Sequence, residues 1–168
     1  SEDRIPGASS YGSNEQGERI LFNFWRDKKN PKGIWRKTTL DEYKKAKPKW
    51  EVVLDVDKLA ETDDIGWVWK GASALPRKRD PMSDNGRIVT RVLLNLSRGG
   101  SDATHLKEFD LLTEAFVPEG EAFILPEAKT RASYKSRDVL LVGSDFGPDS
   151  LTDSGYPRVV KEWARGTP

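Results

Sequence analysis

Residues 91–117 show a regular alternation of apolar and polar positions. In residues 91–97, Val92, Leu94 and Leu96 point to one side of an extended backbone and the residues between them to the other, which predicts a strand with two unlike faces. The loop that follows holds two adjacent glycines, which take positive φ freely. A return strand is expected at 104–110 and a short third strand at 115–117, so the stretch predicts an antiparallel meander.

This pattern occurs more than once along the chain. Residues 21–26 (LFNFWR) match residues 93–98 (LLNLSR), and residues 140–144 (LLVGS) are a weaker copy. The expected return strands also resemble one another, at 34–38, 107–109 and 161–163. Three unevenly spaced meanders indicate radial repetition with loop insertions, as in a β-propeller. The alternative is one antiparallel sheet or sandwich whose strands are alike by chance.

The rest of the chain supplies strands and loops rather than long helices. Further strands are expected near residues 5–11, 50–56, 67–75, 123–126, 131–134, 139–143 and 158–163. Thr39 and Glu42 have the spacing of a capping box, which predicts a helical turn through residues 43–46, ended by Pro48. Residues 57–64 are expected as a connection with at most one helical turn. The predicted fold class is therefore all-β.

Composition narrows the function classes. The 168 residues fit one or two domains, and a net charge of +1 creates no global field that would attract nucleic acid or a membrane. There is no cysteine, which excludes disulfides, thiolate nucleophiles and cysteine metal sites, and fits a cytoplasmic protein. No apolar run is long enough to span a bilayer, and the N-terminus does not resemble a signal peptide. Both ends are expected to be cut points in a longer protein.

No catalytic, cofactor-binding or metal-binding residue is expected in this chain. A Gly-x-Ser-x-Gly nucleophile motif is absent, and His105, the only histidine, is expected as a partly exposed residue of a strand. Asp145, Asp149 and Asp153 could converge on calcium, but their loop lacks EF-hand spacing, and such residues more often bind backbone groups in turns. Paired-carboxylate chemistry stays open, since nothing selects one pair.

Residues 26–49 contain ten lysines or arginines and three acidic residues. Trp25, Trp35, Tyr43 and Trp50 are interleaved with this charge or flank it. Such a pattern is compatible with a nucleic-acid surface. Sheet packing with lysines on the wet face is the favoured interpretation, and the six tryptophans are expected to pack the sheets rather than hold a ligand.

Several segments resemble the N-terminal region of prolyl oligopeptidase-family proteins, a family of serine peptidases (S9), and in particular a poorly characterised branch of it. They are residues 22–27 (FNFWRD), 35–40 (WRKTTL), 96–104 (LSRGGSDAT), 125–129 (LPEAK) and the long run 142–158 (VGSDFGPDSLTDSGYPR). The likeness runs from Arg4 onward and is most specific in residues 142–158, while residues 7–18 and 77–88 fit it less well.

The resemblance implies a seven-bladed propeller above an α/β-hydrolase domain. The chain would be a single partial propeller domain, residues 1–168, with about three blades at 1–64, 65–122 and 123–168. The family's catalytic serine, acid and histidine lie in the hydrolase domain, and no residue here matches them, so His105 is not the catalytic histidine. The chain itself is expected to be inactive.

In such an enzyme the propeller would be a steric gate that admits short peptide substrates. The expected partners are that peptide substrate and the missing blades and hydrolase domain of the same protein. Because a partial ring leaves apolar sheet faces uncovered, the fragment is also expected to self-associate. The alternatives are a stand-alone all-β module that binds a peptide or glycan, and a scaffold that has lost its serine. The residues do not distinguish a peptidase from an esterase.

Overall fold

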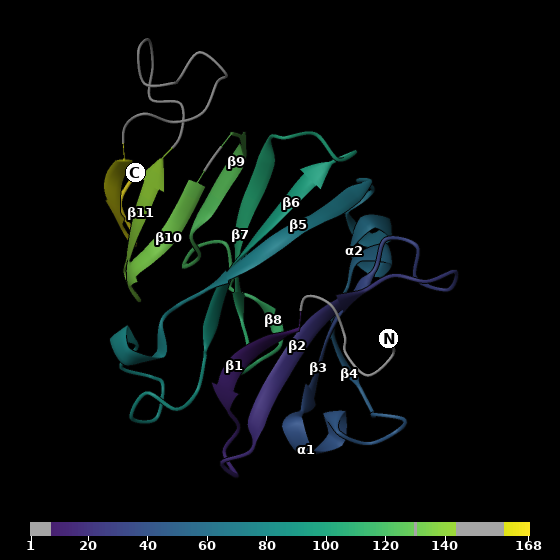
Figure 1. Ribbon diagram of the computed structural model, residues 1–168. Helices are drawn as coiled ribbons and strands as arrows, with labels where there is room; N and C mark the ends of the chain where they lie inside the picture. Colours follow the sequence, from purple (N-terminus) through teal and green to yellow (C-terminus); the bar gives the residue numbers. More distant parts are fainter. Residues whose placement is uncertain (1–7, 130, 144–159) are drawn as a thin grey trace.

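The computed structural model describes residues 8–129, 131–143 and 160–168, and Figure 1 shows their arrangement. Within these residues the strands form three antiparallel sheets. The first sheet contains, in spatial order, β1 (Ser9–Ser13), β2 (Arg19–Trp25), β3 (Ile34–Thr39) and β4 (Glu51–Asp55). The expected all-β class is confirmed.

The second sheet contains β5 (Trp67–Ala74), β6 (Arg91–Arg98), β7 (Thr104–Asp110) and β8 (Ala115–Phe116). A further strand, β9 (Ile124–Ala128), pairs with the first half of β7, while β8 pairs with its last two residues. The third sheet contains β10 (Arg131–Ser136), β11 (Val139–Gly143) and β12 (Val160–Ala164). Residues 124–126, expected as the approach to the third unit, are thus hydrogen-bonded into the second sheet.

The repeated sequence segments occupy equivalent strands of the three sheets. β2, β6 and β11 carry the repeated motif, and each is the second strand of its sheet. β3, β7 and β12 carry the three return segments, and each is the third strand of its sheet. The likeness between segments is therefore structural rather than accidental.

Two short α-helices and one 3₁₀ turn interrupt the strands in the described residues. The helix α1 (Leu40–Tyr43) begins earlier than expected, and only half of the capping box forms: the Thr39 hydroxyl accepts a hydrogen bond from the Glu42 amide at 3.1 Å, whereas the Glu42 carboxylate accepts from the Lys49 amide at 2.9 Å. The described part of the chain contains no helix with the length and apolar character that crossing a bilayer requires.

The second helix, α2 (Val56–Asp63), replaces most of the expected connection after β4. The Asp55 carboxylate caps it by accepting a hydrogen bond from the Lys58 amide at 3.1 Å. Asp64 ends it in the left-handed conformation at φ 53°. Val56 and Ala60 bury one side of the helix against Trp67 and the second sheet, so the helix forms because it has an apolar stripe to cover.

The second sheet is the centre of the molecule, because apolar side chains cover both of its faces. Val92 and Leu94 of β6 pack toward the first sheet, in a cluster with Phe22, Trp35, Val53 and Phe109. Leu93 points the other way, into a cluster with Leu75, Leu106, Phe123, Tyr134, Leu140 and Val142 that joins the third sheet. The prediction that residues 91–97 have two unlike faces is confirmed: the face with Val92, Leu94 and Leu96 is apolar and fully buried, whereas the other carries the half-buried Arg91 and Asn95. That second face nevertheless contributes Leu93 to a core of its own, because β6 lies between two neighbouring sheets.

The turn between β2 and β3 depends on Gly33. Its φ is +98°, a backbone conformation that residues other than glycine rarely adopt. A Cβ atom built at this position would lie 2.2 Å from the Phe24 ring. The glycine therefore permits both the turn and the close approach of Phe24.

We expect Gly33→Ala to lower the free energy of unfolding of the chain by about 2 kcal/mol, since it adds backbone strain and a clash with Phe24. Gly120→Ala is the matched control, because Gly120 has no positive φ and no atom within 4 Å of a built Cβ; its effect should stay within about 0.5 kcal/mol. Urea unfolding of both variants measures the difference. Equal stabilities would contradict this account of the turn.

Candidate functional site

His105 lies in β7 with 19% of its side chain exposed. Its ring meets the indole of Trp67 edge to face, with centroids 5.1 Å apart. Its Nε2 atom is 3.6 Å from a carboxylate oxygen of Glu127 and makes no hydrogen bond within the described residues. A general base needs a hydrogen-bonded nucleophile, so the geometry presents His105 as a packing residue of the strand.

The described ranges contain no group of three or more histidine, cysteine or carboxylate side chains that could hold a metal ion. Asp145, Asp149 and Asp153 lie outside the described residues, as does most of the loop at 143–147. The notable chemistry of the described residues is that of buried ion pairs, one cation clamp and two polar pockets.

A buried carboxylate joins the second and third sheets. Glu108 of β7 has a fully buried side chain, and Arg165, just after β12, forms two hydrogen bonds to it: Nη1 to Oε1 at 2.7 Å and Nη2 to Oε2 at 2.9 Å. The Tyr134 hydroxyl donates to Oε2 at 2.7 Å, and the Phe123 amide donates to Oε1 at 3.1 Å. Arg91 lies 3.4 Å from Oε2. The carboxylate is thus satisfied by groups from three parts of the chain.

These contacts set the ionisation of the cluster. Burial alone would raise the pKa of Glu108, but hydrogen bonds from Arg165, Tyr134 and the Phe123 amide outweigh it and hold the pKa below its usual value. Burial, together with the Glu108 charge, raises the pKa of Tyr134. The hydrogen bond to Glu108 raises the pKa of Arg165. The cluster is a fixed ion pair at neutral pH and has a structural role.

A second buried acid ties a long loop to the third sheet. The Asp80 side chain is fully buried and accepts hydrogen bonds from the Thr90 hydroxyl and from Arg137 Nη1, the latter at 3.1 Å. The same Arg137 nitrogen lies 2.8 Å from the Thr90 hydroxyl oxygen. Arg137 belongs to the turn between β10 and β11, so the pair anchors the loop before β6 to that turn.

The four interleaved aromatic residues divide into two groups. Trp35 is buried in the core, as the packing interpretation expects. Trp25 and Trp50 instead both contact the guanidinium of Arg36, whose carbon lies 4.6 Å and 4.3 Å from the two ring centroids. Tyr43 meets Trp50 edge to face at 6.4 Å. We call Trp25, Arg36 and Trp50 the Arg36 clamp.

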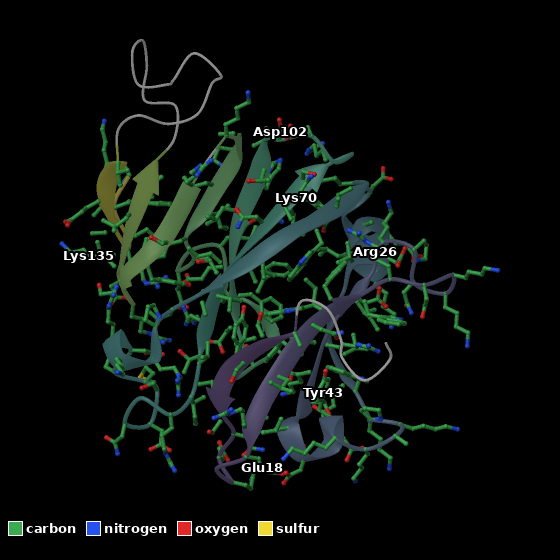
Figure 2. All side chains as sticks on the ribbon, in the orientation of Figure 1. Glu18, Arg26, Tyr43, Lys70, Asp102 and Lys135 are labelled. Atoms are coloured by element: carbon green, nitrogen blue, oxygen red, sulfur yellow. The ribbon has the colours of Figure 1, made fainter. Side chains whose placement is uncertain are left out.

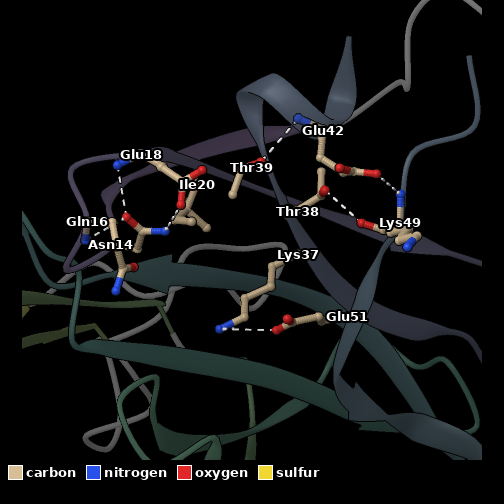
Figure 3. Close-up of a pocket in the computed structure, with 10 residues that line it drawn as sticks. All are labelled: Asn14, Gln16, Glu18, Ile20, Lys37, Thr38, Thr39, Glu42, Lys49 and Glu51. Atoms are coloured by element: carbon tan, nitrogen blue, oxygen red, sulfur yellow. Dashed lines mark hydrogen bonds and ion pairs between the residues drawn. The ribbon is translucent and has the colours of Figure 1, made fainter. Parts of the chain in front are cut away.

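A polar pocket of about 520 Å³ lies at the end of the first sheet near α1 (Figure 3). Its lining residues are Asn14, Gln16, Glu18, Ile20, Lys37, Thr38, Thr39, Glu42, Lys49 and Glu51. Lys37 is 2.7 Å from Glu114 and 3.8 Å from Glu51, and the Thr38 hydroxyl donates to the Lys49 carbonyl at 2.8 Å. Lys37 and Thr38 of this pocket thus already have partners within the chain.

A second polar pocket of about 390 Å³ lies between the second and third sheets and includes Lys70 and Asp102. Figure 2 shows these two residues near one end of the molecule and Glu18 of the first pocket near the other. The remaining lining residues are Asn95, Thr104, Arg131 and Ala132. The lining is polar and carries charges of both signs, with Asp102 opposing Lys70 and Arg131.

The sequence did not predict the buried ion pairs, although the position of Glu108 in its strand indicated a buried acid. Glu108 follows Thr104 and Leu106 at two-residue spacing, so it lies on the same buried face of β7. A lone acid on a buried face needs a partner. That partner, Arg165, is 57 residues away in sequence, and local patterns could not identify it.

No family model matches the chain. Over 147 residues, or 88% of its length, the chain is 37% identical to a Sinorhizobium fredii protein named "Uncharacterized peptidase y4nA". It is 33% identical over 162 residues, or 93% of its length, to the Rickettsia prowazekii "Uncharacterized peptidase RP174". A solved structure of a post-proline cleaving enzyme from Rickettsia typhi superposes with a TM-score of 0.75 and 31% identity over 94% of the chain.

These matches show that the chain is related to peptidases. It spans only about a fifth of them, namely 19% and 21% of the two curated relatives and 22% of the solved structure. The resemblance to the prolyl oligopeptidase family is thereby confirmed, because the post-proline cleaving enzyme belongs to that family. The chain corresponds to one part of such a protein.

Glu108→Gln should lower the free energy of unfolding at pH 7 by about 3 kcal/mol, because it leaves Arg165 without its buried counter-ion. Because the folded pKa of Glu108 is lowered, its contribution is present above the unfolded value of about 4.3 and is lost as the pH falls through the folded value. The stability of the unaltered chain should therefore fall more steeply in acid than that of the variant.

Denaturant unfolding between pH 7 and pH 3 measures this difference. Glu119→Gln is the matched control, since Glu119 is exposed, and it should change stability by no more than about 0.5 kcal/mol at any pH. Parallel pH profiles for the unaltered chain and Glu108→Gln would contradict the role assigned to the buried carboxylate.

Proposed function

We propose that the chain is the N-terminal part of the β-propeller of a prolyl oligopeptidase-like serine peptidase. The observation that carries this proposal is the match to peptidases, including a post-proline cleaving enzyme, over 94% of the chain but only 22% of that enzyme. The three sheets support it, since they are similar meanders packed face to face, as blades of a propeller are.

In this proposal the three sheets are three of seven blades. The first blade comprises residues 1–64 and the second begins at residue 65. Because β9 pairs with β7, we move the end of the second blade from residue 122 to Ala128. The third blade then runs from residue 129 to residue 168. The hydrolase domain with the catalytic serine, acid and histidine then lies in the rest of the parent protein.

The role we propose for this part is that of a steric gate. A rigid propeller over an enclosed active site would admit short peptides and exclude folded proteins. The buried contacts of Glu108 and Asp80 suit this role, because they hold the third sheet against the second through two fully buried carboxylates. The chain alone would be inactive. We also propose a cytoplasmic location, in keeping with the absence of cysteine.

Alone, the chain should self-associate through its outer sheet faces. Trp25 and Val52 of the first sheet are 41% and 51% exposed, and Val160 of the third sheet is 64% exposed. In the parent these faces would be covered by neighbouring blades, and in the fragment they remain available to other copies. A monodisperse monomer in analytical ultracentrifugation at high concentration would count against this.

The test of the function is an intact-mass measurement on the native protein, combined with a fluorophosphonate probe that labels active-site serines. We expect a mass about five times the 18.9 kDa of this chain, by the share of its relatives that it spans, and one labelled serine outside residues 1–168. The isolated chain should remain unlabelled.

Other outcomes decide between the alternatives. A native mass near 18.9 kDa without labelling would refute the proposal and leave a small binding module. A large protein that the probe does not label would refute the peptidase activity and leave a scaffold that has lost its serine. Cleavage of short peptides compared with ester substrates would then separate a peptidase from an esterase.

A further inference from the structure

The polar pocket between the second and third sheets owes one of its side chains to a β-bulge. Gly71 of β5 pairs with Asn95 of β6, whereas Lys70 has no partner of its own and is the extra residue of the bulge. Gly71 permits this irregularity, because its φ of +126° is rarely adopted by other residues. Bulges change the direction in which a side chain points, and here Lys70 lines the pocket.

Lys70 is a cation without a counter-ion in the structure. Its side chain is exposed and forms no hydrogen bond or ion pair within residues 8–129, 131–143 and 160–168. The lining also contains a second cation, Arg131 of β10, and one acid, Asp102 of the loop between β6 and β7. An unpaired lysine at the wall of a pocket is available to an anionic ligand.

Neutral hydrogen-bond donors line the same pocket. Thr104 is 9% exposed, and its hydroxyl donates to the Asn95 side-chain oxygen at 3.5 Å. The Asn95 side-chain nitrogen makes no hydrogen bond among the described residues, so it can donate to a ligand. The pocket volume of about 390 Å³ falls within the range of small-ligand sites, about 300–1,000 Å³. An ammonium beside an amide N–H is a donor set that suits a carboxylate.

The pocket lies beside the first strands of two neighbouring sheets. Lys70 belongs to β5 and Arg131 to β10, and these two strands contact each other. The blades of a propeller are arranged around a central channel. In the proposed propeller the first strands would line that channel, since the second and third sheets meet there. The pocket would then face the peptides that enter the channel.

We propose that this pocket binds the C-terminal carboxylate of a peptide, with Lys70 as the counter-ion and Asn95 as a second donor. The inference rests on the proposed function, which brings short peptides to this part of the molecule. Each such peptide carries a free terminal carboxylate, whereas an internal segment of a folded protein carries none. A site with a cation and a donor discriminates against a ligand that lacks the matching group. The parent protein would therefore select a free C-terminus in addition to small size.

Equilibrium binding to the full-length parent protein tests the proposal. The probe is dansyl-triglycine, which contains no proline and ends in a carboxylate. The comparison peptide is the same compound with a C-terminal amide. We expect the carboxylate form to bind about tenfold more tightly at low ionic strength, and added salt to reduce this difference.

Lys70→Met should weaken binding of the carboxylate form about tenfold and leave binding of the amide form unchanged, because only the carboxylate form uses the lysine charge. Lys70→Arg should retain part of the preference. Lys58→Met is the matched control, since Lys58 is an exposed lysine of α2 whose side chain has no partner within the described ranges. This control should keep the full preference. Thermal unfolding checks that each variant is folded.

Three results would overturn the proposal: equal affinity of the unaltered protein for the two forms, no detectable binding of the carboxylate form, or an undiminished preference in Lys70→Met. A further peptide, dansyl-Gly-Glu-Gly amide, carries its carboxylate on a side chain. If this peptide binds as tightly as dansyl-triglycine, the assignment of the pocket to a chain terminus is wrong.

These outcomes separate this inference from the proposed function, because binding is measured without hydrolysis. If the serine of the native protein is labelled but the carboxylate form is not preferred, only the carboxylate site fails. If the serine is not labelled and Lys70→Met loses the preference, the carboxylate site stands and the peptidase activity fails.

Discussion

The buried carboxylate of Glu108 is the contact on which the arrangement of the second and third sheets depends. Arg165, which follows the last strand, donates two hydrogen bonds to this carboxylate. The Tyr134 hydroxyl and the Phe123 amide donate to it as well. A buried ion pair adds little net stability compared with an apolar contact, but losing one partner is costly. Its value is therefore geometric: the pair fixes how the apolar cluster shared by the two sheets, with Leu93 and Leu106 on one side and Leu140 on the other, comes together.

The second constraint is that the middle sheet is covered on both faces. The apolar residues of β6 contribute to two cores, one shared with each neighbouring sheet, and this leaves the outer faces of the first and third sheets without a partner sheet among the described residues. In a stack of this kind, each outer sheet needs a further sheet to cover its open face. The exposed side chains of Trp25, Val52 and Val160 lie where such a stack would continue.

The sequence predicted the strands well where alternation and turn residues agreed, as in β7 and β11, whose bounds match the structure. It also identified the repeat, because Asn23 and Asn95 hold the same place in β2 and β6. It missed α2, whose short apolar stripe becomes stable only against Trp67. The partners of Glu108 and Arg36 could not be predicted from the sequence, because such contacts depend on how distant strands pack rather than on local pattern.

The central claim is that these sheets are successive blades of a larger ring above a hydrolase domain. An experimental structure of the full-length parent protein tests it most directly. The account predicts that residues 8–168 keep the three sheets seen here, that further blades continue from the third sheet and close against the first, and that a separate α/β domain carries the nucleophilic serine. A structure in which these residues stand apart as a complete unit, with both outer faces open to solvent, would contradict it.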